Sequence, residues 1–148
     1  MRRIVNILVL AGFALGVPAR AEEGPTTFYV QLIWGTDGEH PPEPGSKRAG
    51  PKVSDVFRPV FKWKNYWEIC RKQVPVALGH KARVRLSHER EVEIDLTNPK
   101  LRKVTAFHKS EFVDRTIKSA GEGMTLIGGD RDRQSVWFIV VRRDKPAE

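Results

Sequence analysis

The chain has 148 residues, of which 40% are hydrophobic and 30% are charged, and its formal net charge is +8 at pH 7. This length and composition suit one domain of ordinary size with its own hydrophobic core, and they exclude a low-complexity chain. Cys70 is the single cysteine of the sequence, which excludes an intrachain disulfide and a zinc site built from several cysteines. We expect its thiol to be an inert, buried group rather than an intermolecular disulfide.

Residues 1–21 have the three parts of a secretory signal peptide. Met1-Arg2-Arg3 is a basic start, residues 4–17 are largely apolar, and residues 18–21 end on the small-x-small pattern that signal peptidase recognises. The apolar part is shorter than the roughly 20 residues that a membrane-spanning helix needs. We therefore expect cleavage before Glu22, export to the periplasm or the cell exterior, and a mature chain without a membrane span.

The mature chain, residues 22–148, is expected to form a single β-rich domain. Loss of Arg2, Arg3 and Arg20 with the signal would lower its formal net charge from +8 to +5. Its basic runs also lie close to acidic ones in the sequence. A nucleic-acid partner is therefore not expected, because such partners call for a concentrated basic surface.

Residues 28–34 are rich in aromatic and β-branched side chains and predict the first strand. Residues 35–51 hold four glycines and four prolines, which predicts a long, exposed loop. One or two turns of helix are expected near Ser54. Apolar residues recur there at helical spacing, namely Val53, Val56, Phe57, Val60 and Phe61, and Pro59 limits the length of the helix.

The clearest alternation of apolar and polar residues runs from position 61 to position 70 and predicts a half-buried strand. The apolar set, assigned to the core, is Phe61, Trp63, Asn65, Trp67 and Ile69. The opposite set, assigned to solvent, is Lys62, Lys64, Tyr66, Glu68 and Cys70. Because it combines an aromatic ring with two ammonium groups, the face formed by Lys62, Lys64, Tyr66 and Glu68 is a candidate binding surface.

Residues 81–86 and 90–96 predict a hairpin with Ser87-His88-Glu89 at its tip. Positions that face each other would then sum to 176. This register would place Arg85 opposite Glu91, Arg83 opposite Glu93, Lys81 opposite Asp95, Val84 beside Val92, and Ala82 beside Ile94. A slip of one residue would mix charged and apolar faces, so the register should be well defined.

Further strands are predicted at residues 104–107, 112–117, 124–127 and 136–141, separated by turn-forming residues. The last of these is continuously apolar and is expected to be a central strand. About seven or eight short strands with regularly spaced turns predict an all-β fold, either an antiparallel β-sandwich or a partly open barrel.

No motif points to catalysis, a cofactor or a metal. The four histidines lie in predicted loops or turns without metal-ligand spacing: His40, His80, His88 and His108. Gly128-Gly129-Asp130 lacks the continuation of a calcium or phosphate loop and is read as a turn. An aromatic set could stack on sugars: Trp34, Trp63, Tyr66, Trp67 and Trp137. Three of its tryptophans, however, fall on apolar faces of predicted strands, where burial is the rule.

The favoured hypothesis is an exported, non-catalytic module that binds another protein or a component of the cell envelope. One alternative is a carbohydrate- or polyanion-binding module that uses Lys62, Lys64 and Tyr66. Another alternative is a small hydrolase without a recognisable motif. A nucleophilic Cys70 paired with a histidine would require an activated thiolate in an electropositive pocket.

Overall fold

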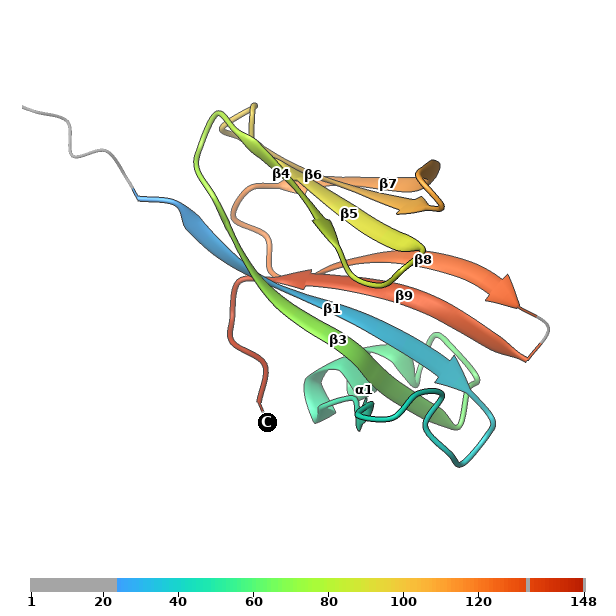
Figure 1. The fold of residues 1–148 in the computed structure, drawn as a ribbon. Helices are drawn as coiled ribbons and strands as arrows, with labels where there is room; N and C mark the ends of the chain where they lie inside the picture. Colours follow the sequence, from blue (N-terminus) through green and yellow to red (C-terminus); the bar gives the residue numbers. More distant parts are fainter. Residues whose placement is uncertain (1–23, 133, 148) are drawn as a thin grey trace, which may run out of the picture.

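The structure is a computed structural model that describes residues 24–132 and 134–147. The predicted signal peptide and its cleavage site lie outside the described residues. Two antiparallel sheets face each other in this structure, which confirms the prediction of an antiparallel β-sandwich (Figure 1). In the described part of the chain, no helix combines the length and the apolar character that a membrane crossing requires.

The larger sheet, sheet A, has the strand order β2-β3-β1-β9-β8. Its strands are β1 (Thr26–Thr36), β2 (Lys47–Arg48), β3 (Asn65–Val76), β8 (Thr125–Asp132) and β9 (Ser135–Arg142). The smaller sheet, sheet B, has the order β4-β5-β6-β7. Its strands are β4 (Lys81–Arg85), β5 (Arg90–Asp95), β6 (Leu101–His108) and β7 (Glu111–Ser119). A short helix, α1 (Pro51–Phe57), lies against sheet A on the side away from sheet B (Figure 1).

The main core fills the space between the two sheets. Val30 and Leu32 of β1 meet Val92 of β5 and Val104 of β6 there, and all four side chains are fully buried. Burial of a side chain of this kind contributes roughly 1.5–3 kcal/mol. Alternate residues of β1 and β5 supply this core, as expected for strands with one face turned to the partner sheet.

A second core covers the outer face of sheet A. Val53 and Phe57, four residues apart on one side of α1, pack on Ile33, Phe138 and Val140 of the sheet. The ring of Phe57 is fully buried and its centroid lies 4.8 Å from that of Phe138. Strand β9 is therefore buried on both faces of sheet A, which explains its continuous apolar run.

The predicted loop at residues 35–51 has different bounds in the structure. Gly35 and Thr36 are buried residues of β1, residues 37–46 are irregular, and Lys47–Arg48 form β2. Gly35 serves close packing rather than a turn, because a Cβ atom at this position would lie 3.0 Å from Val136 Cγ1.

The predicted register of the β4–β5 hairpin is confirmed at every one of its five pairs. Of the three predicted charge pairs, Arg85 contacts its opposite residue Glu91 at 3.3 Å. The other two cations contact the diagonal carboxylate instead: Arg83 contacts Glu91 at 2.7 Å and Lys81 contacts Glu93 at 3.7 Å. Strands twist relative to their neighbours, and long side chains reach the diagonal position on the next strand. The sequence pattern thus gave the pairing of the backbone correctly, whereas the contacts of the charged groups depend on twist.

Candidate binding cleft at the end of sheet A

The candidate face Lys62, Lys64, Tyr66 and Glu68 does not form a single solvent-exposed surface. Lys62 and Lys64 are exposed but precede β3, whereas Tyr66 and Glu68 are only 5% and 8% exposed. The prediction that Tyr66 and Glu68 face solvent is wrong. Both side chains point to the outer face of sheet A, which α1 and its neighbouring segments cover.

An irregularity in the pairing of β1 with β3 also changes the predicted faces. Leu32 is opposite Cys70, but Ile33 is opposite Glu68, so Ile69 is the extra residue of a bulge. Glu68 therefore shares the outer face with Ile33, while Cys70 packs against the core between the sheets. The alternation in the sequence placed Glu68 and Cys70 on one face, and the bulge separates them.

Tyr66 attaches the segment before β3 to the sheet. Its hydroxyl group donates a hydrogen bond to the carbonyl oxygen of Phe61 at 3.1 Å, and its ring centroid lies 5.1 Å from that of Phe57. Burial raises the pKa of the Tyr66 hydroxyl above its ordinary value. Tyr66 thus has a structural role in positioning Phe61.

Glu68 is a buried carboxylate with a full set of partners. The side-chain amide of Gln31 donates to it, and Arg71 Nε donates to Glu68 Oε1 at 2.9 Å. Gln31 is only 1% exposed, so this network lies within the outer-face packing. The guanidinium group of Arg71 offsets the charge of Glu68, which therefore serves structure rather than an exposed binding surface.

The residues assigned to one apolar face are also divided. Phe61 and Trp63 pack against the outer core, while Trp67 lies on the inner face and is 6% exposed. Trp67 is opposite Trp34 of β1, which in turn is opposite Trp137 of β9. The guanidinium groups of Arg48 and Arg90 each lie 4.7 Å from the ring centroids of Trp67 and Trp137, respectively. Cations therefore lie against the two outer rings of this row, and Trp67 is buried, as the sequence predicted.

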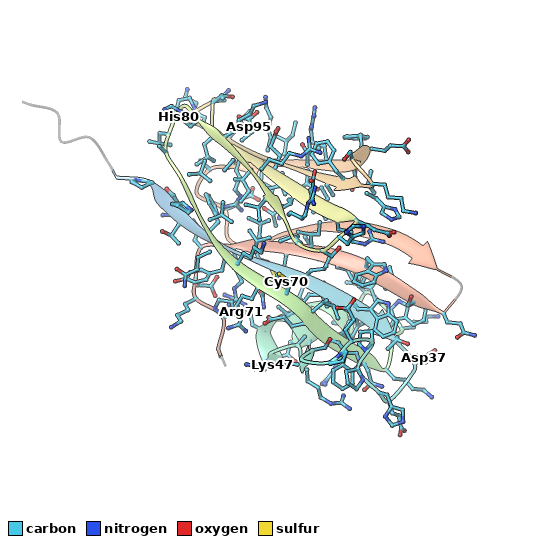
Figure 2. All side chains as sticks on the ribbon, in the orientation of Figure 1. Asp37, Lys47, Cys70, Arg71, His80 and Asp95 are labelled. Atoms are coloured by element: carbon cyan, nitrogen blue, oxygen red, sulfur yellow. The ribbon has the colours of Figure 1, made fainter. Side chains whose placement is uncertain are left out.

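An open cleft of about 400 Å³ lies where β1 ends and the chain approaches β3. Figure 2 shows Asp37, one of its lining residues, just beyond the end of β1. The lining residues are Asp37, Val60, Phe61, Lys62 and Trp63. Lys62 is the one member of the predicted binding face that contributes to this cleft.

Hydrogen bonds fix the wall of the cleft that contains Asp37. The backbone N–H of Lys64 donates to Asp37 Oδ1 at 3.2 Å, and the Asn65 side chain donates to the carbonyl oxygen of Gly38 at 2.8 Å. The N–H of Gly38 donates in turn to the hydroxyl of Thr36 at 3.1 Å. The irregular segment after β1 is thereby held to the start of β3, so the cleft has a defined shape.

The opposite wall is apolar and accessible. Val60 is 69% exposed, and nearby Val56 of α1 is 44% exposed, although both are large aliphatic residues. Phe61 and Trp63 are partly buried and offer aromatic surface beside them. The cleft therefore combines an apolar, aromatic wall with one carboxylate and one ammonium group.

The groups near the cleft and in β3 do not form a nucleophilic or metal site. Burial is the main cause that raises the pKa of the Cys70 thiol, which is the reverse of what a nucleophilic cysteine needs. Asp37 is the one acid among the residues that line the cleft. Within the described ranges, no group of three or more potential metal ligands comes together.

Comparison of the chain with protein-family models, with curated proteins and with solved structures finds no match. Sequence reasoning missed Asp37 and Val60 as members of the site. Asp37 was assigned to a long loop, and no pattern in the sequence indicates its hydrogen bond with the Lys64 N–H just before β3. Val60 was counted as part of an apolar helical stripe, although it follows the end of α1 and faces solvent.

Proposed function

We propose that this chain is an exported, non-catalytic binding module that holds a carbohydrate of the cell envelope in the cleft beside Trp63. The observation that supports the proposal is the composition of this cleft, which sets aromatic and aliphatic side chains beside Asp37 and Lys62. Export rests on the signal-peptide pattern of residues 1–21.

A carbohydrate fits this composition better than a purely apolar or a purely charged ligand. A sugar ring has an apolar face that stacks on an aromatic side chain, and hydroxyl groups at its edge that bind carboxylate and ammonium groups. The cleft of about 400 Å³ falls within the range of small-molecule sites. Exposed Lys62 and Lys64 favour an acidic sugar, because each ammonium group attracts a carboxylate.

The same geometry supports binding rather than hydrolysis. Glycoside hydrolysis ordinarily requires two carboxyl groups on opposite sides of the scissile bond. Asp37 is the one carboxylate among the lining residues, and it already accepts a hydrogen bond from Lys64. A ligand in this cleft would therefore be bound and released unchanged.

The test is calorimetric titration of the mature chain with neutral and uronic-acid-containing oligosaccharides. We expect the acidic oligosaccharides to bind, and Lys62→Ala and Trp63→Ala each to weaken binding tenfold or more. Lys100→Ala is a matched control, because this exposed lysine lies in the turn between β5 and β6, outside the cleft. A thermal melt of each variant verifies folding. Binding that is unaffected by both cleft substitutions, or no binding at all, would contradict the proposal.

A second candidate function is protein binding through the outer face of sheet B. Two large apolar side chains of β7 are exposed there, Phe112 at 60% and Ile117 at 54%. Exposed apolar groups on an otherwise charged face are typical of protein interaction sites. Cross-linking to envelope proteins that is lost in a Phe112→Ser/Ile117→Ser variant, but kept in Trp63→Ala, would favour this function over carbohydrate binding.

A further inference from the structure

A second cavity, of about 170 Å³, lies on the outer face of sheet A beside the start of α1. Its walls come from Gly50–Val53, from the C-terminal segment Lys145–Ala147, and from Gln31 and Arg142 of sheet A. Figure 1 shows the C-terminal segment descending from β9 beside α1. This cavity is separate from the cleft, because Arg142 is at the end of β9 and Trp63 packs near Val136 at its start.

Two polar groups that border this cavity are deeply buried and unsatisfied. Arg142 is 4% exposed, and its Nε atom has no hydrogen-bond partner in the described structure. Gln31 is 1% exposed, and its Oε1 atom likewise has no partner there. An unsatisfied buried polar group is unfavourable, and more so if it is charged. An occupant that accepts from Arg142 and donates to Gln31 would remove both costs.

The charges around the cavity favour an anionic occupant. Asp144 is shared between two cations, since it contacts the Arg142 guanidinium group and lies 2.8 Å from Lys52 Nζ. Hydrogen bonds from Arg142 and Lys52 hold the pKa of Asp144 well below its ordinary value. Two positive charges against one negative charge leave an excess positive charge, and Lys145 in the wall adds another. The contact with Asp144 also shows that the Arg142 guanidinium group donates to a carboxylate.

We infer that this cavity binds a small carboxylic acid with a hydrogen-bond donor next to its carboxylate, that is, an α-hydroxy or α-amino acid. The carboxylate accepts from Arg142 Nε, and the adjacent hydroxyl or ammonium group donates to Gln31 Oε1. The cavity of about 170 Å³ has the volume of roughly five or six water molecules, which is enough for a three-carbon acid.

The C-terminal segment closes this site. Pro146 is buried, and the carbonyl oxygen of Ala147 accepts a hydrogen bond from Arg71 Nη2 at 3.4 Å. The contact between Lys52 and Asp144 fastens the same segment to α1. Bound acid would therefore be covered by residues 145–147, and its binding would stabilise the position of this segment.

The test is calorimetric titration of the mature chain with lactate, alanine, acetate and inorganic phosphate. We expect lactate or alanine to bind at least tenfold more tightly than acetate, which lacks the donor. Tighter binding of lactate would identify the ligand as a hydroxy acid, and tighter binding of alanine would identify it as an amino acid. Arg142→Lys keeps the charge but removes Nε, and should weaken binding tenfold or more. Arg143→Lys is the control, since Arg143 is its exposed neighbour.

A second measurement covers the case in which Arg142→Lys fails to fold. In the unmodified chain, the Nε–H resonance of Arg142 should shift during titration with the acid that binds. Binding of acetate as tight as that of lactate and alanine would overturn the inference, as would binding of phosphate alone. Titration with all four compounds without any movement of this resonance would show that the cavity holds only water, and would also overturn it. The cleft plays no part in these measurements, so this test and the carbohydrate test can fail independently.

Discussion

The β4–β5 hairpin and strand β3 show how differently the same alternation of residues behaves in two sheets. In the hairpin, charged residues face solvent and apolar residues face the core, as predicted. In β3, Tyr66 and Glu68 belong to the polar set of the pattern but are buried beneath α1 and its neighbours. The outer face of sheet B has exposed apolar groups, whereas α1 covers that of sheet A. Alternation therefore indicates which side chains share a face, but not whether that face meets water.

The largest expected effect concerns how far the outer face of each sheet is shielded from solvent. Phe57→Ala should lower the free energy of unfolding by about 3–5 kcal/mol, because it leaves a cavity beneath α1 where the ring is fully buried. Phe112→Ala is its matched control on the outer face of sheet B, where the ring is 60% exposed, and should change stability by about 0.5 kcal/mol or less. Urea denaturation measures both, and equal losses would show that the two faces are covered alike.

A smaller effect is expected for the carboxylates of the two sheets. Glu68→Ala should cost about 1–3 kcal/mol, because it leaves the buried Gln31 amide without an acceptor. Glu93→Ala removes one weak contact, to Lys81 at 3.7 Å, and should cost less than about 1 kcal/mol. Chemical denaturation of both variants gives the comparison. A Glu68→Ala variant as stable as Glu93→Ala would mean that the Gln31–Glu68–Arg71 network contributes little.

The smallest expected effect is a difference between the two sheets in how their stability depends on pH. In sheet B, a hydrogen bond from Thr97 to Asp95, and one from Arg83 to Glu91, lower the pKa of each carboxyl group. A folded-state pKa below the unfolded one gives stability that is present above the unfolded pKa and is lost as pH falls through the folded pKa. The hairpin should therefore lose stability on the acid side.

For sheet A the sign is reversed. Burial raises the pKa of Tyr66 above its ordinary value of 10.0, so its contribution is present below that value and is lost as pH rises through the folded pKa. Amide hydrogen exchange across the pH range should show acid-sensitive β5 amides and alkali-sensitive β3 amides. Tyr66→Phe should remove part of the alkaline loss, and Asp95→Asn part of the acid loss. The same pH profile in both variants and the parent chain would contradict this assignment.

The sandwich and the hairpin register could be predicted from the sequence because of how sheet B is built. Its consecutive strands are joined by tight turns, and one face of the sheet is in water. The turn at Lys109 and Ser110, both with positive φ, belongs to the same local chemistry. Among the residues that line the cleft, Lys62 was predicted, because a charged side chain is expected to be exposed and this one is. The position of Asp37 depends on its hydrogen bond with Lys64, and the burial of Tyr66 depends on Phe57 of α1 and on β1. Each of these contacts joins residues that are distant in the sequence or on different elements. The bulge in β3 opposite β1 could not be predicted either, because the alternation of residues in this part of the sequence looks regular.

The position of β1 determines when this domain can form. β1 lies between β3 and β9, so the first strand of the described chain pairs with the last, more than a hundred residues later. During synthesis the amino-terminal strands are made first. One edge of β1, the central strand of sheet A, therefore stays unpaired until Ser135–Arg142 has been made. Closing so long a loop makes such pairings slow to form. The core between the two sheets can therefore be completed only after the last strand of the described chain has been synthesised.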